Sequence, residues 1–180
     1  MPWTAPRTWT DGELVTKAIM DPHVRDNFLA VPHPVVRKTS NQTVTSSTVL
    51  VNDTALVLPV LANEVWRFEF DILYDGASAG DIKIAFTFPA SGEIVAGGIA
   101  LDAGGTVTSN AFSGTTTPTA SVAYAAFGTG AGNKIFLRIP GVFINAGTGG
   151  SLTLQWAQQT SSATATTVYT NSAIWGARLA

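Results

Sequence analysis

The sequence contains no cysteine, and only 12% of its 180 residues are charged, where about a quarter is usual. The lack of cysteine excludes disulfide bonds, thiolate zinc sites and thiol nucleophiles together. The net charge is -2 and no basic run exceeds the Arg37-Lys38 pair, so bulk charge gives no attraction to nucleic acid. Stability must come from packing or from assembly.

Long apolar runs are missing as well. No stretch approaches the roughly 20 residues of a membrane-spanning helix, and the first residues lack the basic and apolar regions of a secretory signal. The length fits one domain of ordinary size. We therefore expect a protein made in a cytoplasm, with neither a membrane nor a nucleic acid as partner.

Residues 1–38 differ in kind from the rest of the chain, because they carry the helix signals. Thr10 and Glu13 have the spacing of a capping box, in which the two side chains satisfy free amides at a helix start. This spacing predicts a short turn or helix over about residues 11–20.

A second helix start is predicted at Asp21 and Pro22. Aspartate accepts hydrogen bonds at an N-cap, and proline fits the first helical position. Val24 and Phe28 then share one face, four residues apart, with Leu29 beside them. So short an apolar helix needs a partner to stay formed.

Two prolines, Pro32 and Pro34, end this helix and favour an extended linker. We therefore expect two parts, a helical attachment arm with its linker over residues 1–38 and a β domain over residues 39–180. The β domain is expected to fold after removal of residues 1–38.

From about residue 43 the apolar period changes to two, as in half-buried strands. The side chains predicted to face inward are Trp66, Phe68, Phe70, Ile72, Ile82, Ile84, Phe86, Phe88, Ile135, Leu137, Ile139, Leu152, Leu154 and Trp156. Residues 64–88 predict a β-hairpin, Pro140 predicts an edge strand or bulge, and residues 172–180 predict a terminal strand. About eight to ten such strands predict a mainly β fold, an antiparallel β-sandwich or jelly roll.

Charge is distributed unevenly along this β domain. After Asp102 there is no acidic residue, and only Lys134, Arg138 and Arg178 are charged. A monomer usually shows more charge on its solvent faces, so we expect part of this half to be buried in a homo-oligomer. Exposed threonine-rich strands are the alternative.

The opening stretch "PRTWTDGELVTKAIMDPHVRDNFLAV" resembles the start of short virion proteins of tailed bacteriophages and prophages. In these proteins a pattern T-W-x-x-G-E-x-V-T-x-x-x-[ML]-N-x-H-x-R-D-N precedes a β-rich domain. The matching residues are Thr8, Trp9, Gly12, Glu13, Val15, Thr16, Met20, His23, Arg25, Asp26 and Asn27. Asp21 replaces the more usual asparagine, and either residue can cap a helix. The last 30 or so residues, "GGSLTLQWAQQTSSATATTVYTNSAIWGARLA", are similar too.

The resemblance implies a non-enzymatic virion structural protein, an exterior capsid decoration or head-fibre protein held by its N-terminal arm. A tail-fibre or tail-tip module that binds a receptor or host surface glycan is the alternative. The implied partners are further copies of the chain, with a trimer favoured, and another virion protein such as the major capsid or tail protein. The residues expected to carry attachment are Trp9, Val24, Arg25, Asp26, Phe28 and Leu29.

No pattern in the sequence predicts a catalytic site, a metal site or a cofactor. His23 and His33 both precede the β domain, and no nucleophile elbow accompanies them. Glu69 and Asp71 alternate on one strand about 6–7 Å apart, which overlaps the spacing of glycosidase carboxylates. Solvated charges at this spacing are common, so a polysaccharide depolymerase is the weakest of the three hypotheses.

Three further features have structural explanations. Asp75 and Asp81 flank a glycine-rich turn but lack the dense oxygen spacing of calcium loops. Residues 128–134, "GTGAGNK", lead into a strand, whereas phosphate loops lead into a helix, so we expect a hairpin loop. Trp156 and Trp175 could stack on a sugar, but core or subunit-interface packing is the stronger interpretation for Trp156, and Trp175 is ambiguous.

Overall fold

The computed structural model describes residues 7–26, 35–101, 107–114, 119–126, 128 and 130–180. The chain forms two compact units, Met1–His33 and Pro34–Ala180. The second unit, called the β domain below, holds the described strands. Its start lies a few residues before the boundary expected after residue 38, because Val35–Arg37 is already a strand and Lys38 is buried.

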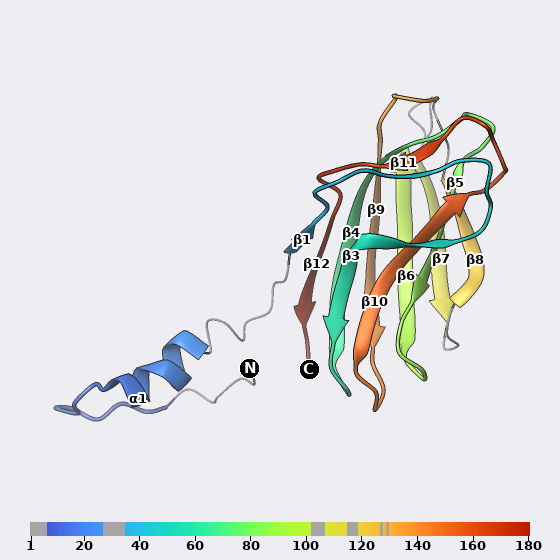
Figure 1. Cartoon of the computed structure of the whole chain (residues 1–180). Coiled ribbons are helices and arrows are strands. Elements are labelled where there is room, and N and C mark those ends of the chain that lie inside the picture. Colours follow the sequence, from blue (N-terminus) through green and yellow to red (C-terminus); the bar gives the residue numbers. More distant parts are fainter. Residues whose placement is uncertain (1–6, 27–34, 102–106, 115–118, 127, 129) are drawn as a thin grey trace. The chain divides into compact units, whose positions relative to one another are not determined.

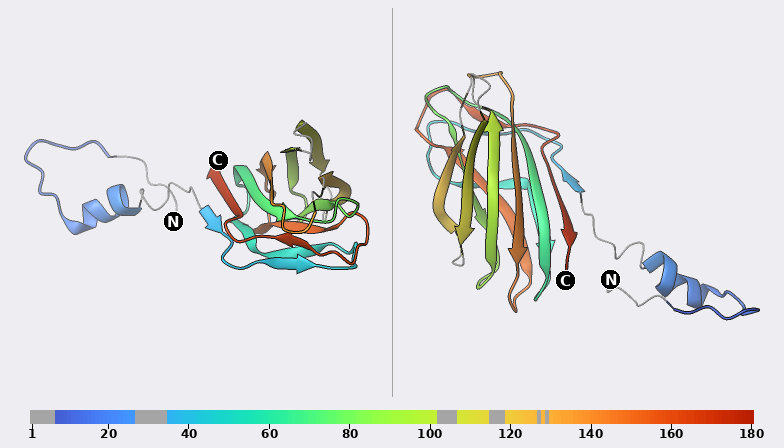
Figure 2. Two further views of the ribbon diagram at one scale, coloured as in Figure 1. Left: turned by 90° about the horizontal axis from the view of Figure 1, so that it is seen from above. Right: turned by 180° about the vertical axis from the view of Figure 1, so that it is seen from behind.

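Two antiparallel sheets make up the β domain (Figure 1). The larger sheet has the order β1 (Val35–Arg37), β12 (Ala173–Arg178), β4 (Val65–Asp75), β9 (Ile135–Ile144), β6 (Glu93–Leu101) and β7 (Val107–Gly114). It also includes β11 (Thr166–Val168), which pairs with β4 and with β2 (Gln42–Val44). The smaller sheet has the order β3 (Val51–Val60), β10 (Gly150–Gln158), β5 (Ile82–Thr87) and β8 (Thr119–Ala126). The view from above in Figure 2 shows the two sheets as separate layers.

The strand order is that of a jelly roll. If β3 to β10 are numbered one to eight, the smaller sheet has the order 1-8-3-6, and the larger sheet contains the run 2-7-4-5. Eight strands that alternate between two sheets in this way form the double Greek key of a jelly roll. The expected antiparallel β-sandwich is confirmed, and β1, β2, β11 and β12 extend its larger sheet on the β4 side.

The core lies between the two sheets, where the period-two pattern placed it. Every side chain predicted to face inward is buried, except Ile135, which is partly buried against the core. Rings from the two layers meet directly, with centroids 6.2 Å apart for Phe68 and Phe86 and 5.3 Å apart for Phe88 and Phe143. Each such side chain contributes about 1.5–3 kcal/mol when it is fully buried.

The hairpin predicted over residues 64–88 is wrong. Strand β4 pairs with β9 and β12 in the larger sheet, whereas β5 pairs with β10 and β8 in the smaller one. The glycine-rich turn between them therefore crosses from one layer to the other. Strands β8 and β9 also lie in different layers, so the glycine-rich stretch before β9 is not a hairpin loop. Alternation shows which face of a strand is buried but says nothing about its neighbours.

Pro140 does not mark an edge strand, since β9 lies between β4 and β6. The residue sits in register with Glu69 of β4. Toward β6, the paired positions end at Ala96 opposite Gly141 and begin again at Ile99 opposite Arg138. Pro140 therefore has no paired position on β6. A gap of this kind is what a residue without an N–H group produces in a ladder.

A buried ion pair fixes the start of the β domain. The Lys38 ammonium lies 2.9 Å from both carboxylate oxygens of Asp53, and both side chains are fully buried. Asp53 also accepts hydrogen bonds from the amides of Ala55 and Leu56, at 2.9 and 3.0 Å, and from the Trp156 indole at 3.3 Å. The pair thus joins the residue after β1 to β3 and β10 of the smaller sheet.

A second buried carboxylate, Glu64, holds the C-terminal strand. It accepts hydrogen bonds from the Leu61 amide at 2.7 Å, the Trp66 indole at 2.9 Å and the Arg178 guanidinium at 3.0 Å. Burial raises the pKa of Glu64, but these three hydrogen bonds and the charge of Arg178 outweigh burial, so the pKa lies below its ordinary value of 4.5.

We expect Glu64→Gln to lower the free energy of unfolding at neutral pH by about 1–3 kcal/mol, as for hydrogen bonds to a charged group. Because the folded-state pKa lies below the unfolded one, the stabilisation is present above the unfolded-state pKa of 4.5 and is lost as the pH falls through the folded-state pKa. Urea unfolding at a series of pH values should show a gap between the two proteins that closes on acidification.

The exposed Asp11, replaced by asparagine, is the control for this experiment, and Asp11→Asn should leave stability unchanged across the series. A gap that stays constant down to about pH 3 would mean that the charge of Glu64 does not contribute.

Candidate functional site

The described part of the N-terminal unit, residues 7–26, contains one short helical segment, which begins later than the first predicted helix. Helix α1 (Lys17–Met20) continues directly into the π-helix η1 (Asp21–Arg25) (Figure 1). Helix η1 begins at Asp21 with Pro22 in its first turn, as predicted, but Asp21 has helical dihedral angles and does not cap it. The Asp26 amide donates to the Asp21 carbonyl, five residues back, which widens this turn, and Pro22 has no N–H group to donate to the preceding turn. None of the described helices is long and apolar enough to cross a membrane.

The capping-box residues form a turn before the helix and do not start it. The Glu13 amide donates to the Thr10 carbonyl at 3.1 Å, and the Thr10 amide lies 3.5 Å from the Glu13 carboxylate. Gly12 has a φ of 77°, which favours glycine at this point of the turn. The Arg7 guanidinium pairs with Glu13 and lies 5.2 Å from the centre of the Trp9 ring.

Charged side chains form a row along the helical segment. The Asp21 carboxylate pairs with Lys17 at 2.8 Å and with Arg25 at 2.9 Å, and Arg25 pairs with Asp26 at 2.7 Å. The hydrogen bond from Lys17 and the charge of Arg25 lower the pKa of Asp21 despite some desolvation. Arg25 and Asp26, expected to bind a partner, are thus paired with each other, and their role in register stays a prediction.

Five large apolar side chains in the described part of this unit are exposed, and its helical segment buries no residue. Trp9 is 46% exposed and Val24 is 43% exposed. Three other apolar side chains, Leu14, Val15 and Met20, are also exposed, and none of them is among the residues expected to carry attachment. The sequence already indicates their exposure, because a helix this short cannot bury all the apolar residues in it and before it. Phe28 and Leu29 lie outside the described residues.

The carboxylates considered for glycoside hydrolysis belong to an ion-pair cluster on the larger sheet. Arg138 of β9 contacts Glu69 at 2.8 Å and Asp71 at 3.2 Å, both on β4. The Trp175 indole donates to Glu69 at 3.3 Å. One guanidinium thus contacts both carboxylates, and the cluster keeps one net negative charge.

The two aspartates beside the glycine-rich turn bind backbone amides. Asp75 accepts hydrogen bonds from the Gly132 amide and from the Tyr169 hydroxyl, the latter at 2.7 Å, and Asp81 accepts one from the Gly128 amide at 2.9 Å. The hydrogen bond to Asp75 raises the pKa of Tyr169. Within the described part of the chain, no three His, Cys, Asp or Glu side chains come together as a metal site. His33 lies outside that part.

The two tryptophans considered for oligomer contacts have different surroundings. Trp156 is fully buried in the chain's own core, with its indole on Asp53. Trp175 lies on the opposite face of β12 from the buried Ile174, half-buried beside Glu69. Of the two, only Trp175 reaches the surface of the β domain.

The Lys38–Asp53 pair is the main feature that the sequence analysis missed. In the sequence, Lys38 belongs to a short basic pair with Arg37. Alternation from Val36, which packs against the core, places Lys38 on the same face, and this was the available signal. A lysine on the buried face requires a buried anionic partner.

Comparison with known proteins gives no family. No protein-family model matches the chain, and no curated protein matches it. Among solved structures, the structure of infectious bursal disease virus Gx strain has 10% sequence identity and a TM-score of 0.21, and the VP2 subviral particle of the same virus has 11% identity and a TM-score of 0.18. Each alignment covers 81% of this chain, but the chain spans only 39% and 40% of those two chains. Similarity this low carries no argument about function.

Proposed function

We propose that the chain is a non-enzymatic structural protein of a tailed-bacteriophage virion. Its jelly-roll domain forms a homo-oligomer, and its N-terminal unit attaches that oligomer to another virion protein. An exterior position on the head, as a decoration or head-fibre protein, fits the single described β domain without a shaft of repeats. The observation that carries the proposal is the exposed apolar surface of the N-terminal unit.

Five large apolar side chains of that unit are exposed: Trp9, Leu14, Val15, Met20 and Val24. Its helical segment spans only nine residues, Lys17 to Arg25, and buries none of them. Isolated helices of this length are marginal in water, and their stability in proteins comes from packing. Such a unit is stabilised when a partner covers its apolar side chains, and Trp9 is the type of residue that dominates such contacts.

Two further observations support a virion role. The T-W-x-x-G-E-x-V-T pattern that marks the resemblance to phage virion proteins lies in this same unit. The jelly roll is a fold that recurs in viral capsid proteins and also in lectins. The fold alone does not fix a function, so the proposal depends on the N-terminal unit.

Attachment can be tested by counting copies of the protein on assembled particles. Removal of residues 1–33 should leave the β domain folded but absent from particles. Trp9→Ala combined with Val24→Ala should raise the dissociation constant for particles by about thirtyfold, since two central anchors typically cost at least 2 kcal/mol. Asp11→Ala, an exposed polar change at a position that the pattern leaves open, is the control and should bind normally.

Particles that still carry the truncated protein would contradict attachment through the N-terminal unit. Density for the full chain only on the tail in images of intact particles would replace the head position by the tail one.

A further inference from the structure

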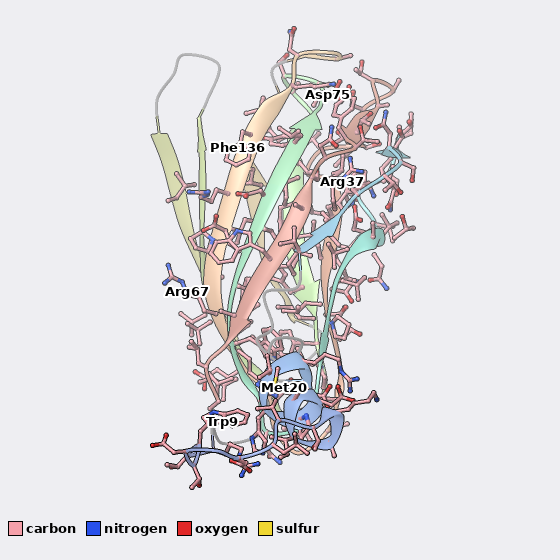
Figure 3. The ribbon with its side chains drawn as sticks, turned by 90° about the vertical axis from the view of Figure 1, so that its left-hand side faces the viewer. Trp9, Met20, Arg37, Arg67, Asp75 and Phe136 are labelled. Carbon is pink, nitrogen blue, oxygen red and sulfur yellow. The ribbon has the colours of Figure 1, made fainter. Side chains whose placement is uncertain are left out.

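The outer face of the larger sheet carries most of the exposed apolar surface of the β domain. Among its described residues, nine large apolar side chains are exposed. Six of these belong to strands of the larger sheet, namely Val35, Val95, Ile99, Phe136, Val142 and Ile144, and the other three, Val49, Leu61 and Leu179, lie outside the strands. Their exposed fractions on the sheet run from 37% to 66%. Figure 3 shows Phe136 and Arg67 on this sheet, toward opposite ends of the strands.

The register of the strands brings three of these side chains together. Val142 of β9 lies opposite Val95 of β6 on one side and opposite Arg67 of β4 on the other. Two residues further along β9, Ile144 lies opposite Glu93 of β6. Directly opposed side chains in antiparallel strands have Cβ atoms about 4.5–5.5 Å apart. Val142, Ile144 and Val95 therefore form one patch across β9 and β6, called the apolar face below, whereas Ile99 lies opposite Arg138 and Val35 lies on β1.

The smaller sheet shows the opposite character on its outer side. Asn52, Lys83, Thr87 and Gln155 point outward from β3, β5 and β10, and Gln155 bonds Asn52 at 2.8 Å. No described residue of these three strands is an exposed large apolar side chain. A sheet with one solvated face is usually polar there, so the difference indicates that the apolar face is covered by another molecule.

The charges beside the apolar face indicate which molecule covers it. Arg67 lies on the β4 flank and Glu93 on the β6 flank, and both are exposed. Among the described residues neither has an ion-pair partner in its own chain, whereas Arg138 is paired with Glu69 and Asp71. One flank thus offers a positive charge and the other a negative charge. A second copy carries the same two charges, so the positive flank of one copy complements the negative flank of the other.

We propose that copies of this chain meet through the apolar face around a three-fold axis, with Arg67 of each copy opposite Glu93 of the next. A contact between two different flanks is heterologous, and it closes into a ring when the rotation is that of a cyclic oligomer. This inference rests on the oligomer in the proposed function and names its surface. It does not depend on the role of the N-terminal unit.

The experiment measures the molar mass of the full chain by light scattering and analytical ultracentrifugation. The unmodified chain should be a trimer. Val142→Glu places a charge in the centre of the apolar face and should raise the dissociation constant by at least about a hundredfold, the effect of roughly 3 kcal/mol. Lys83→Glu, a charge change on the outer side of the smaller sheet, is the matched control and should leave the mass unchanged.

Charge reversal tests the pairing and leaves the core untouched. Arg67→Glu and Glu93→Arg should each weaken assembly about tenfold, because like charges then face each other. The double variant on one chain restores opposite charges and should recover the unmodified mass. This rescue would not occur if either residue acted only within its own chain.

The possible outcomes distinguish failure of the inferred surface from failure of the proposed oligomer. A monomeric unmodified chain would overturn both the oligomer and its surface. An oligomer that Val142→Glu and the charge reversals leave intact would overturn the apolar face alone. Loss of the oligomer after removal of residues 1–33, with no effect of the face variants, would show that the N-terminal unit holds the copies together and would also overturn the inference.

Discussion

Replacing Lys38 by alanine is expected to lower the free energy of unfolding by about 3–5 kcal/mol. The carboxylate of Asp53 would stay buried without its cation, since both side chains are fully buried in the folded chain. The amides of Ala55 and Leu56 and the Trp156 indole would still donate to it, but they carry no charge to balance it. An uncompensated buried charge is among the largest effects that a single substitution can have.

Urea unfolding followed by tryptophan fluorescence measures this loss, with Thr39→Ala as the exposed neighbouring control. Pairing Lys38→Met with Asp53→Asn in a double-mutant cycle separates the ion pair from the packing of the lysine chain. The double variant should be more stable than the sum of the single losses predicts. A loss below about 1 kcal/mol for Lys38→Ala would show that the pair does not act as a buried one.

Two truncations that differ by five residues should behave very differently. Removal of residues 1–33 takes away the N-terminal unit and should change the stability of the β domain little. Removal of residues 1–38 also takes away β1, its pairing with β12, and Lys38. We expect the longer deletion to cost at least about 4 kcal/mol, a large part of the 5–15 kcal/mol that holds a typical domain.

Thermal and urea unfolding of the two truncated proteins measure the difference. This prediction corrects the expectation that the β domain folds normally without residues 1–38, because the boundary suggested by the prolines falls inside the domain. Equal stability of the two truncated proteins would contradict the anchoring role of Lys38 and β1. Unfolding of the shorter truncation would show that the N-terminal unit belongs to the core.

The same five residues connect the two proposed roles of the chain. A load on an attached N-terminal unit would pass into the β domain at β1, whose last residue precedes Lys38. The Lys38 amide donates to the Ser172 carbonyl at 2.8 Å, and its carbonyl accepts from the Asn171 amide at 2.9 Å. Backbone pairing and a buried ion pair therefore hold the chain at the point where attachment would pull on it.

The sequence by itself determined the fold class and the buried face of four strands, β4, β5, β9 and β10. Side chains alternate across a strand whatever its neighbours are, so the pattern through Phe68, Ile84 and Leu154 could be assigned locally. The terminal strand was found in the same way, and β12 forms there. The apolar residues of the N-terminal unit were likewise visible, since hydrophobicity is a property of each residue.

Only the tertiary structure decided which strands are neighbours and which charges are satisfied. Strands β4 and β5 are adjacent in sequence yet lie in different sheets, because jelly-roll connections cross between layers. Pro140 lies in a central strand, and the ladder between β9 and β6 has a gap beside it because proline has no N–H group. Lys38 and Asp53 are 15 residues apart, and their pairing depends on how β1 and β3 pack. Such contacts join distant segments through the global arrangement of the chain, which local periodicity does not encode.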